Sequence, residues 1–227
     1  MYTLHIANRN YSSWSLRPWM LMRALGIPFE ERLHVFEEGS NRDRFRAFSP
    51  NGRVPCLHDG STVVWDSLAI AEYLAERHAG VWPEDADARA WARCASAEMH
   101  SGFDALRSRC SMTCGQRVDI GSPGDALTAD VERIDELWRE GPTRFGGPYL
   151  AGAQPGAVDA FYAPVVFRVQ TYGLPLSADA RAYADLMLGH PAMREWYDAA
   201  LAESWRDAAH EREIAAAGRV RADYRST

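Results

Sequence analysis

Hydrophobic and polar positions divide the chain into two parts with different patterns. In the first part, short runs rich in β-branched and aromatic residues alternate with longer runs of helical spacing. Strands are expected at 2–6, 29–36, 53–58 and 61–65, and helices at 15–25, 40–48 and 67–78. The resulting order, βαβ-αββα, predicts a small α/β domain over residues 1–80.

Glycine and proline set several ends of these elements. Gly26 and Pro28 end the first predicted helix, in which Pro18 is tolerated only within the first turn. Asp59-Gly60 stands between two apolar runs and is a strong signal for a two-residue hairpin turn. Both signals support a compact alternation of strands and helices.

After Pro83 the pattern is helical only. A long amphipathic run extends from residue 87 to about residue 114, and apolar side chains repeat at helical spacing from Leu127 to Trp138. Further helices are expected at 157–172, 178–188 and 192–209. We therefore predict that a short linker leads into an all-α domain over residues 87–227. The polar, arginine-containing tail from Glu211 onward is either disordered or folded over the site.

Composition and charge exclude several classes of protein. The 227 residues carry 25 basic and 31 acidic side chains, and the net charge of −6 argues against a general binder of nucleic acid or anionic membranes. All 25 basic residues are arginine, which a bias in genomic base composition explains most simply. No apolar run is long enough to span a membrane, and the N-terminus lacks the pattern of a secretory signal. A cytoplasmic location is therefore expected.

The cysteines predict neither disulfides nor a metal site. Cys56, Cys94, Cys110 and Cys114 are irregularly spaced in a chain large enough to fold without disulfides, so reduced thiols are expected. No histidine or second cysteine pair stands at zinc-ligand spacing from Cys110 and Cys114, and we expect no metal.

Hydroxyl side chains gather where the first strand turns into the first helix. Tyr11, Ser12, Ser13 and Ser15 lie within five residues of one another. One serine is expected to cap the helix, but three serines are more than capping needs. A helix N-terminus offers free N–H groups and the positive end of the helix dipole. This cluster is therefore suited to holding an anion such as a thiolate.

Two further motifs indicate a ligand with peptide-like and amino-acid-like groups. Pro55 follows Arg53-Val54 at the start of a predicted strand, and a cis Val54-Pro55 bond would present the Val54 backbone to an extended peptide. Asp66-Ser67 begins a helix and is either a plain cap or a site for an amino-acid head group. In the second case Ser67 binds the carboxylate and Asp66 lies near the ammonium group.

The segment Gly156 to Asp159 precedes an apolar helix and is interpreted as structural. Asp159 falls at the third helical position, where a carboxylate can bond back to the backbone of the cap residue.

Together these motifs resemble the cytosolic glutathione S-transferases, and SSWSLR is most similar to the serine-type, zeta-like members. SSWSLR, NGRVPCL, VVWDSLAIAEYL and the GAVDA box occur in the order and spacing of that family, so the resemblance covers essentially the whole chain. It implies the glutathione S-transferase fold, a thioredoxin-like N-terminal domain followed by an all-α C-terminal domain. It also implies glutathione as co-substrate and a homodimer that uses the long helix and the Ser67 helix.

Matched motif by motif, the resemblance assigns roles to individual residues. Ser12 matches the catalytic serine, and Ser13 matches the hydroxyl beside it. The residues matched to glutathione binding are Arg53, Val54, Pro55, Asp66 and Ser67. Arg17 on the first helix is a further candidate for a carboxylate of glutathione, because arginine can form two parallel bonds to it.

The sequence departs from the family pattern at two positions. Trp14 replaces the reactive cysteine of the zeta-like motif, which removes a feature of maleylacetoacetate isomerases and of cysteine-type thiol transfer. Gly156 replaces the serine or threonine cap of the helical half, at a cost of only about a few tenths of a kcal/mol.

The resemblance implies a detoxifying transferase that activates glutathione as a thiolate for attack on electrophilic small molecules. The electrophile pocket is expected between the domains, lined by Trp14, Met99, Phe103 and Arg107, and Arg107 could meet an acidic co-substrate. Two alternatives stay open: a zeta-like glutathione-dependent isomerase or peroxidase, and a non-catalytic binding or regulatory protein of this fold. The residue that contacts the thiol also stays open among Ser12, Ser13 and Tyr11.

Overall fold

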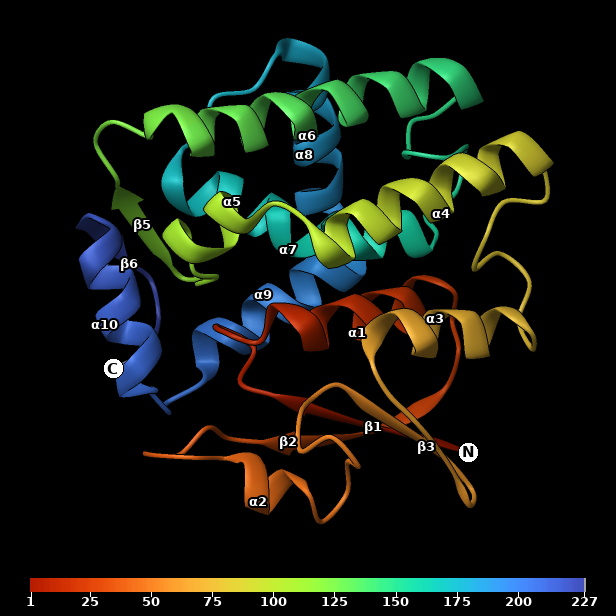
Figure 1. Cartoon of the computed structure of the whole chain (residues 1–227), viewed down its shortest axis with the longest axis horizontal. Helices are drawn as coiled ribbons and strands as arrows, with labels where there is room; N and C mark the ends of the chain where they lie inside the picture. Colours follow the sequence, from red (N-terminus) through yellow and green to blue (C-terminus); the bar gives the residue numbers. More distant parts are fainter. Residues whose placement is uncertain (227) are drawn as a thin grey trace.

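A four-stranded mixed sheet organises the N-terminal half of the computed structural model, which describes residues 1–226 (Figure 1). Its elements are β1 (Tyr2–Ala7), α1 (Ser13–Ala24), β2 (Phe29–His34), α2 (Arg42–Phe45), β3 (Cys56–Asp59), β4 (Thr62–Val64) and α3 (Ser67–Ala75). The strand order is β2-β1-β3-β4. β1 and β2 are parallel and are therefore joined by the crossover helix α1, whereas β3 and β4 form the predicted antiparallel hairpin. The predicted element order is confirmed.

The two faces of this sheet carry different side chains. Leu4, Ile6 and Leu57 are fully buried in the hydrophobic core. His5 alternates with them along β1 and therefore points to the opposite face. In Figure 1, α1 and α3 lie between the sheet and the helical half, while α2 lies beyond the sheet. The sheet thus places the start of α1 against the helical half.

The C-terminal half is mainly helical and is built around one buried helix. Its elements are α4 (Ala86–Ser101), α5 (Asp104–Arg109), β5 (Gln116–Asp119), α6 (Gly124–Phe145), α7 (Ala157–Tyr172), α8 (Ala178–Gly189), α9 (Pro191–Ala202), α10 (Ala208–Ala217) and β6 (Arg219–Asp223). Nearly every residue of α7 is buried, and α7 packs against α1, α4 and α8. Within residues 1–226, no helix combines the length and apolarity that a membrane crossing requires.

The structure corrects four details of the predicted elements. The long predicted helix is two helices, because Gly102 and Phe103 separate α4 from α5 and Phe103 has a left-handed backbone with φ 59°. The last helix also ends earlier, at Ala202, and α10 follows as a separate element. α2 spans only four residues. α1 begins at Ser13, so Pro18 lies beyond its first turn and supplies no N–H to the Trp14 carbonyl.

The C-terminal tail is folded, and the second half is not purely helical. β6 pairs antiparallel with β5, from Gln116 opposite Asp223 to Asp119 opposite Arg219. Figure 1 shows α10 beside these strands, at the edge where the two halves of the chain meet. The choice that the sequence left open, a disordered tail or a folded one, is therefore settled in favour of a folded tail.

Candidate functional site

A pocket of about 410 Å³ lies where the start of α1 faces the helical half. Eight residues singled out from the sequence line it: Tyr11, Ser12, Ser13, Trp14, Arg17, Arg53, Val54 and Arg107. Other lining residues include Phe36, Ser111, Met112, Arg168, His210 and Glu213. The pocket therefore brings together the hydroxyl cluster, the Arg53-Val54 segment and side chains from the C-terminal half.

Ser12 belongs to a short chain of buried hydrogen bonds at the N-terminus of α1. The Ser12 and Ser15 hydroxyl oxygens are 2.7 Å apart, and Ser15 Oγ accepts the Ala7 N–H at 3.2 Å. Ser12 occupies the N-cap position, but its side chain makes no capping bond. When Ser15 donates its proton to Ser12 Oγ, the Ser12 proton is left to point toward a ligand in the pocket.

Tyr11 is already engaged by the C-terminal tail. Its hydroxyl donates to Glu211 Oε1 at 2.6 Å and accepts from the Arg225 guanidinium at 3.2 Å. Burial and the Glu211 carboxylate raise the pKa of Tyr11 well above its ordinary value. These contacts favour Ser12 or Ser13 over Tyr11 as the hydroxyl that contacts a thiol.

Three arginines give the pocket a positive interior. Arg17 and Arg168 are buried, and burial together with Arg107 lowers the pKa of Arg17 to about 9. Arg168 Nε donates to the Cys110 carbonyl at 2.7 Å, and burial lowers the pKa of Arg168 to about 10. Arg17 Nε and Nη1 are buried without a hydrogen-bond partner among residues 1–226. A pocket of this charge is suited to an anion.

Trp14 fixes two of these arginines. Its ring lies 4.1 Å from the Arg17 guanidinium carbon and 4.7 Å from that of Arg107, both within cation–π range. The His100 ring meets Trp14 edge-on, with centroids 5.2 Å apart. Trp14 therefore positions the two guanidinium groups of Arg17 and Arg107. This role does not require the thiol of the cysteine that Trp14 replaces in the zeta-like motif.

The two motifs that the sequence matched to glutathione binding are placed differently. The Val54-Pro55 bond is cis, and Val54 lines the pocket. Asp66 and Ser67 lie outside the pocket lining. The Asp66 carboxylate accepts the Leu68 N–H at 2.9 Å as the cap of α3, and the Ser67 hydroxyl is buried without a partner among the described residues. Asp66 therefore caps α3, as one of the two alternatives expected.

Met99 and Phe103 are buried in the core and are not part of the pocket wall. The Met99 carbonyl nevertheless accepts from Arg107 at 3.3 Å and from Arg17 at 3.5 Å. Met99 therefore contributes to the site through its backbone, by orienting the arginines.

The sequence reasoning missed Arg168 and His210. Arg168 is the lone charged residue in the apolar stretch from Phe161 to Val169, and that isolation was a usable signal. His210 lies between the last predicted helix, 192–209, and the polar tail that begins at Glu211, and nothing local distinguished it.

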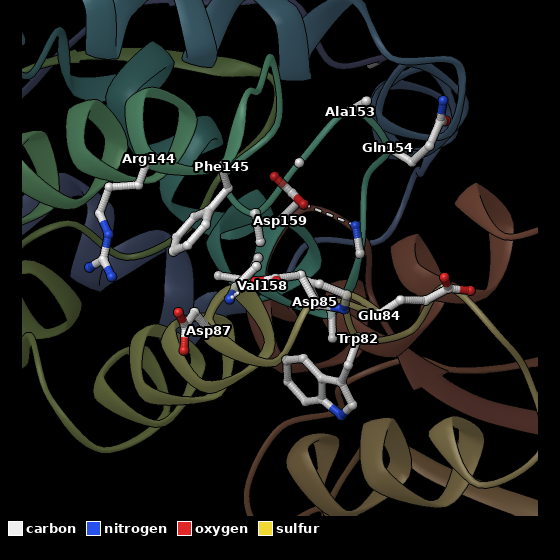
Figure 2. Close-up of a pocket in the computed structure, with 17 residues that line it drawn as sticks. Trp82, Glu84, Asp85, Asp87, Arg144, Phe145, Ala153, Gln154, Val158 and Asp159 are labelled. Carbon is white, nitrogen blue, oxygen red and sulfur yellow. Dashed lines mark hydrogen bonds between the residues drawn. The ribbon is translucent and has the colours of Figure 1, made fainter.

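A second pocket, of about 780 Å³, lies beside the N-terminus of α7 (Figure 2). Asp159 borders it, but this carboxylate accepts the Leu150 and Gly156 N–H groups at 3.0 and 2.9 Å and the Tyr183 hydroxyl at 3.1 Å. The structural interpretation of Asp159 is confirmed. Glu84, Asp85, Asp87 and Arg144 also line this pocket, but its lining contains no hydroxyl, thiol or imidazole side chain.

No group of three or more histidine, cysteine, aspartate or glutamate side chains among residues 1–226 is arranged to hold a metal ion.

Comparison with known proteins identifies relatives of both halves. The family model described as glutathione S-transferase, N-terminal domain, matches residues 11–77, and the C-terminal domain model matches residues 89–199. The chain is 26% identical over 182 residues to maleylpyruvate isomerase of Ralstonia sp., covering 74% of this chain and 84% of that protein. It is 25% identical over 175 residues to maleylacetoacetate isomerase of Rattus norvegicus, covering 74% and 78%.

A solved structure shares the fold. A glutathione transferase homolog from Burkholderia gl BGR1, with bound glutathione, superposes with a TM-score of 0.65 at 21% identity, covering 88% of this chain and 97% of that chain.

Proposed function

Because the chain belongs to the glutathione S-transferase family, we propose that it binds glutathione in the 410 Å³ pocket and activates the thiol with the Ser12 hydroxyl. The buried Ala7–Ser15–Ser12 hydrogen-bond chain is the observation that supports this role most directly. In this proposal the Val54 backbone, beside the cis bond, pairs with the cysteinyl part of glutathione. Arg53 lies near its charged end.

The energy required is within reach of these groups. Lowering a thiol pKa by about two units needs roughly 2.7 kcal/mol of preferential stabilisation of the thiolate. A hydrogen bond to a charged group contributes about 1.5–3 kcal/mol, and a helix N-terminus adds about 0.3–1 kcal/mol. Ser12 at the start of α1 combines both contributions.

The arginine cluster favours a second substrate that carries a carboxylate. Arg17, Arg107 and Arg168 line one pocket, and two buried nitrogens of Arg17 have no partner among the described residues. A carboxylate would satisfy these donors and relieve the mutual repulsion of the cations. Glutathione-dependent isomerisation of an acidic unsaturated substrate is therefore the second candidate beside conjugation, and the Ralstonia and rat relatives are named as isomerases.

The test combines thiolate absorbance near 240 nm with a substrate panel. Wild type is expected to bind glutathione largely as thiolate at pH 7. Ser12→Ala should raise the pKa of the bound thiol and reduce kcat/KM by about 10- to 100-fold, the value of one charge-assisted bond. Ser13→Ala is the matched control. If Ser13→Ala loses activity and Ser12→Ala does not, the role belongs to Ser13. If both variants are as active as wild type, neither serine takes part in the mechanism.

The panel separates the candidate reactions. A chloronitrobenzene reports conjugation, an organic hydroperoxide reports peroxidase activity, and maleylpyruvate reports isomerisation. Glutathione binding without turnover of any substrate would support a non-catalytic binding protein instead. Failure to bind glutathione at millimolar concentration would overturn the enzyme proposal.

A homodimer through α3 and α4 also stays a prediction. Light scattering of the purified protein measures it directly, and a monomeric mass would contradict it.

A further inference from the structure

His210 occupies a position in the pocket that neither the family motifs nor the family models reach. It lies on α10, beyond residue 199 where the C-terminal family match ends, and it lines the same pocket as Ser12 and Ser13. Its ring stacks on Tyr11 at 5.0 Å between centroids and on Phe36 at 5.2 Å. Aromatic groups from the N-terminal half thus hold an imidazole from the C-terminal tail.

Asp207 fixes the orientation of this imidazole. His210 Nδ1 lies 2.6 Å from Asp207 Oδ2, and the same oxygen accepts the His210 N–H at 3.0 Å as the cap of α10. Asp207 is only 9% exposed. A carboxylate bonded to Nδ1 selects the tautomer with its proton on that nitrogen and leaves Nε2 as the acceptor. Nε2 makes no hydrogen bond to any residue from 1 to 226.

Charged side chains from several elements surround the imidazole. Asp207 faces Nδ1, and Glu213 lines the pocket from the same helix. Glu211 and Arg225 pair with each other beside Tyr11. Arg107 and Arg168 are the opposing charges in the pocket lining. The imidazole is therefore bonded to one carboxylate, that of Asp207, and shares the pocket with a second, that of Glu213.

We infer that His210 is the proton acceptor for the glutathione thiol, an inference that rests on the proposed function. The S–H bond breaks, the proton forms a bond to Nε2, and the neutral pair becomes a thiolate and an imidazolium held by Asp207. Ser12 donates to the thiolate, so the two residues act on the same sulfur in different ways. After conjugation the imidazolium releases its proton to solvent. In isomerisation the thiolate is regenerated on the enzyme, and the proton stays on His210.

Counting protons provides the decisive measurement. Glutathione is mixed with the full-length protein in weak buffer at pH 7.5 with a pH indicator, while absorbance near 240 nm reports thiolate. Wild type is expected to form thiolate while releasing much less than one proton per thiolate, because His210 retains the proton. In His210→Phe, which keeps the stacked ring, each thiolate formed should release one proton, and kcat/KM should fall about 10- to 100-fold.

Asp207→Asn is the matched second variant. Asparagine still caps α10 but carries no charge for the imidazolium, so the acid limb of kcat/KM should move to lower pH relative to wild type. Circular dichroism and Tm establish that both variants are folded.

The outcomes separate the two proposals. If wild type binds no glutathione thiolate, the proposed function fails. If wild type releases one proton per thiolate, as His210→Phe does, with equal kcat/KM, the proposed function stands and His210 is not the acceptor.

Discussion

The fully buried Ser15 hydroxyl determines which way the Ser12 hydroxyl can point. Ser15 Oγ accepts the Ala7 N–H and lies 2.7 Å from Ser12 Oγ. Ser15→Ala removes this partner, so Ser12 should lose orientation, and kcat/KM should fall about 3- to 10-fold, equivalent to about 1 kcal/mol. The Ala7 N–H would lose its acceptor as well, lowering the free energy of unfolding by about 1–2 kcal/mol. Thiolate absorbance and urea unfolding measure the two effects. Unchanged thiolate at reduced stability would assign Ser15 a structural role only.

Arg17 illustrates a conflict between stability and ligand binding. Its guanidinium is buried, with two nitrogens unpartnered among the described residues and a pKa lowered to about 9 by burial and by Arg107. The fold disfavours its charge, so the folded state should gain stability as pH rises from about 9 toward the ordinary arginine value.

Arg17→Met should therefore raise Tm while weakening the binding of carboxylate substrates by about 10-fold or more. Calorimetry and inhibition by a small dicarboxylate measure these effects, and the exposed Arg212→Met is the control. A lower Tm in Arg17→Met would show that its stacking on Trp14 and Phe161 outweighs the cost of the buried charge.

At the level of elements, a histidine cluster attaches residues 36–53, the segment that contains α2, to the sheet. The His5 ring stacks on Phe48 at 4.5 Å, and its Nδ1 lies 2.9 Å from His34 Nε2. His58 approaches the same ring at 4.5 Å and bonds the Phe48 carbonyl at 2.8 Å. Residues 36, 41, 45, 52 and 53 of this segment line the pocket, so the cluster supports the candidate site from behind.

This cluster predicts that stability falls in mild acid. Burial, followed by His58, His34 and Arg32, lowers the pKa of His5 to about 4, and burial and Arg44 lower that of His34. A folded-state pKa below the unfolded value means that the stabilisation is complete above about 6.5 and is lost as pH falls toward 4. The loss should be on the order of 2 kcal/mol for His5 after allowance for solvent screening. Urea unfolding at pH 7 and pH 5 tests this, and His5→Phe should show a smaller difference. An equal pH dependence in both proteins would contradict it.

Local patterns predicted the elements wherever the responsible forces are local. The order of strands and helices through α3 follows from alternation, turn residues and caps, and the Asp159 cap follows from its position in α7. The break at Phe103 was missed because an uninterrupted helical pattern does not reveal a left-handed residue. β5 and β6 were missed because their pairing joins segments about 100 residues apart and leaves most of β6 exposed.

At the scale of the whole molecule, the candidate site likewise combines residues from local motifs with residues that only long-range contacts bring to it. Ser12, Ser13, Arg53 and Val54 lie in short motifs, and the fold brings them to one pocket. Arg168 and His210 join them only because α7 packs against α1 and the tail returns to the N-terminal half. The isolated charge of Arg168 was a signal in the sequence, but no short pattern encodes which segments these two residues meet, so their place in the pocket required the structure.

The tail is held to the N-terminal half by one buried ion-pair network. The Arg225 side chain is 3% exposed and bonds the carboxylates of Glu211 and Asp223 as well as the Tyr11 hydroxyl. Asp223 in turn pairs with Gln116 on β5. One arginine therefore connects the start of α1, α10 and the β5–β6 pair, and it keeps His210 against Tyr11.

Arg225→Met should release this connection. Removing the cation leaves two partly exposed carboxylates and a hydroxyl without their partner, at a cost of about 1–3 kcal/mol to the docked tail after allowance for solvent screening. Residues 208–226 should then exchange amide hydrogens much faster, while α7 and the sheet stay protected, because Ile214 is the one fully buried core residue that this segment contributes. Hydrogen exchange with mass spectrometry measures this directly, and the exposed ion-pair variant Arg221→Met is the control. If His210 acts as inferred, Arg225→Met should also release about one proton for each thiolate formed on glutathione binding, as is expected for His210→Phe. Protection of α10 equal to that in wild type would show that the Arg225 network is not needed to hold the tail.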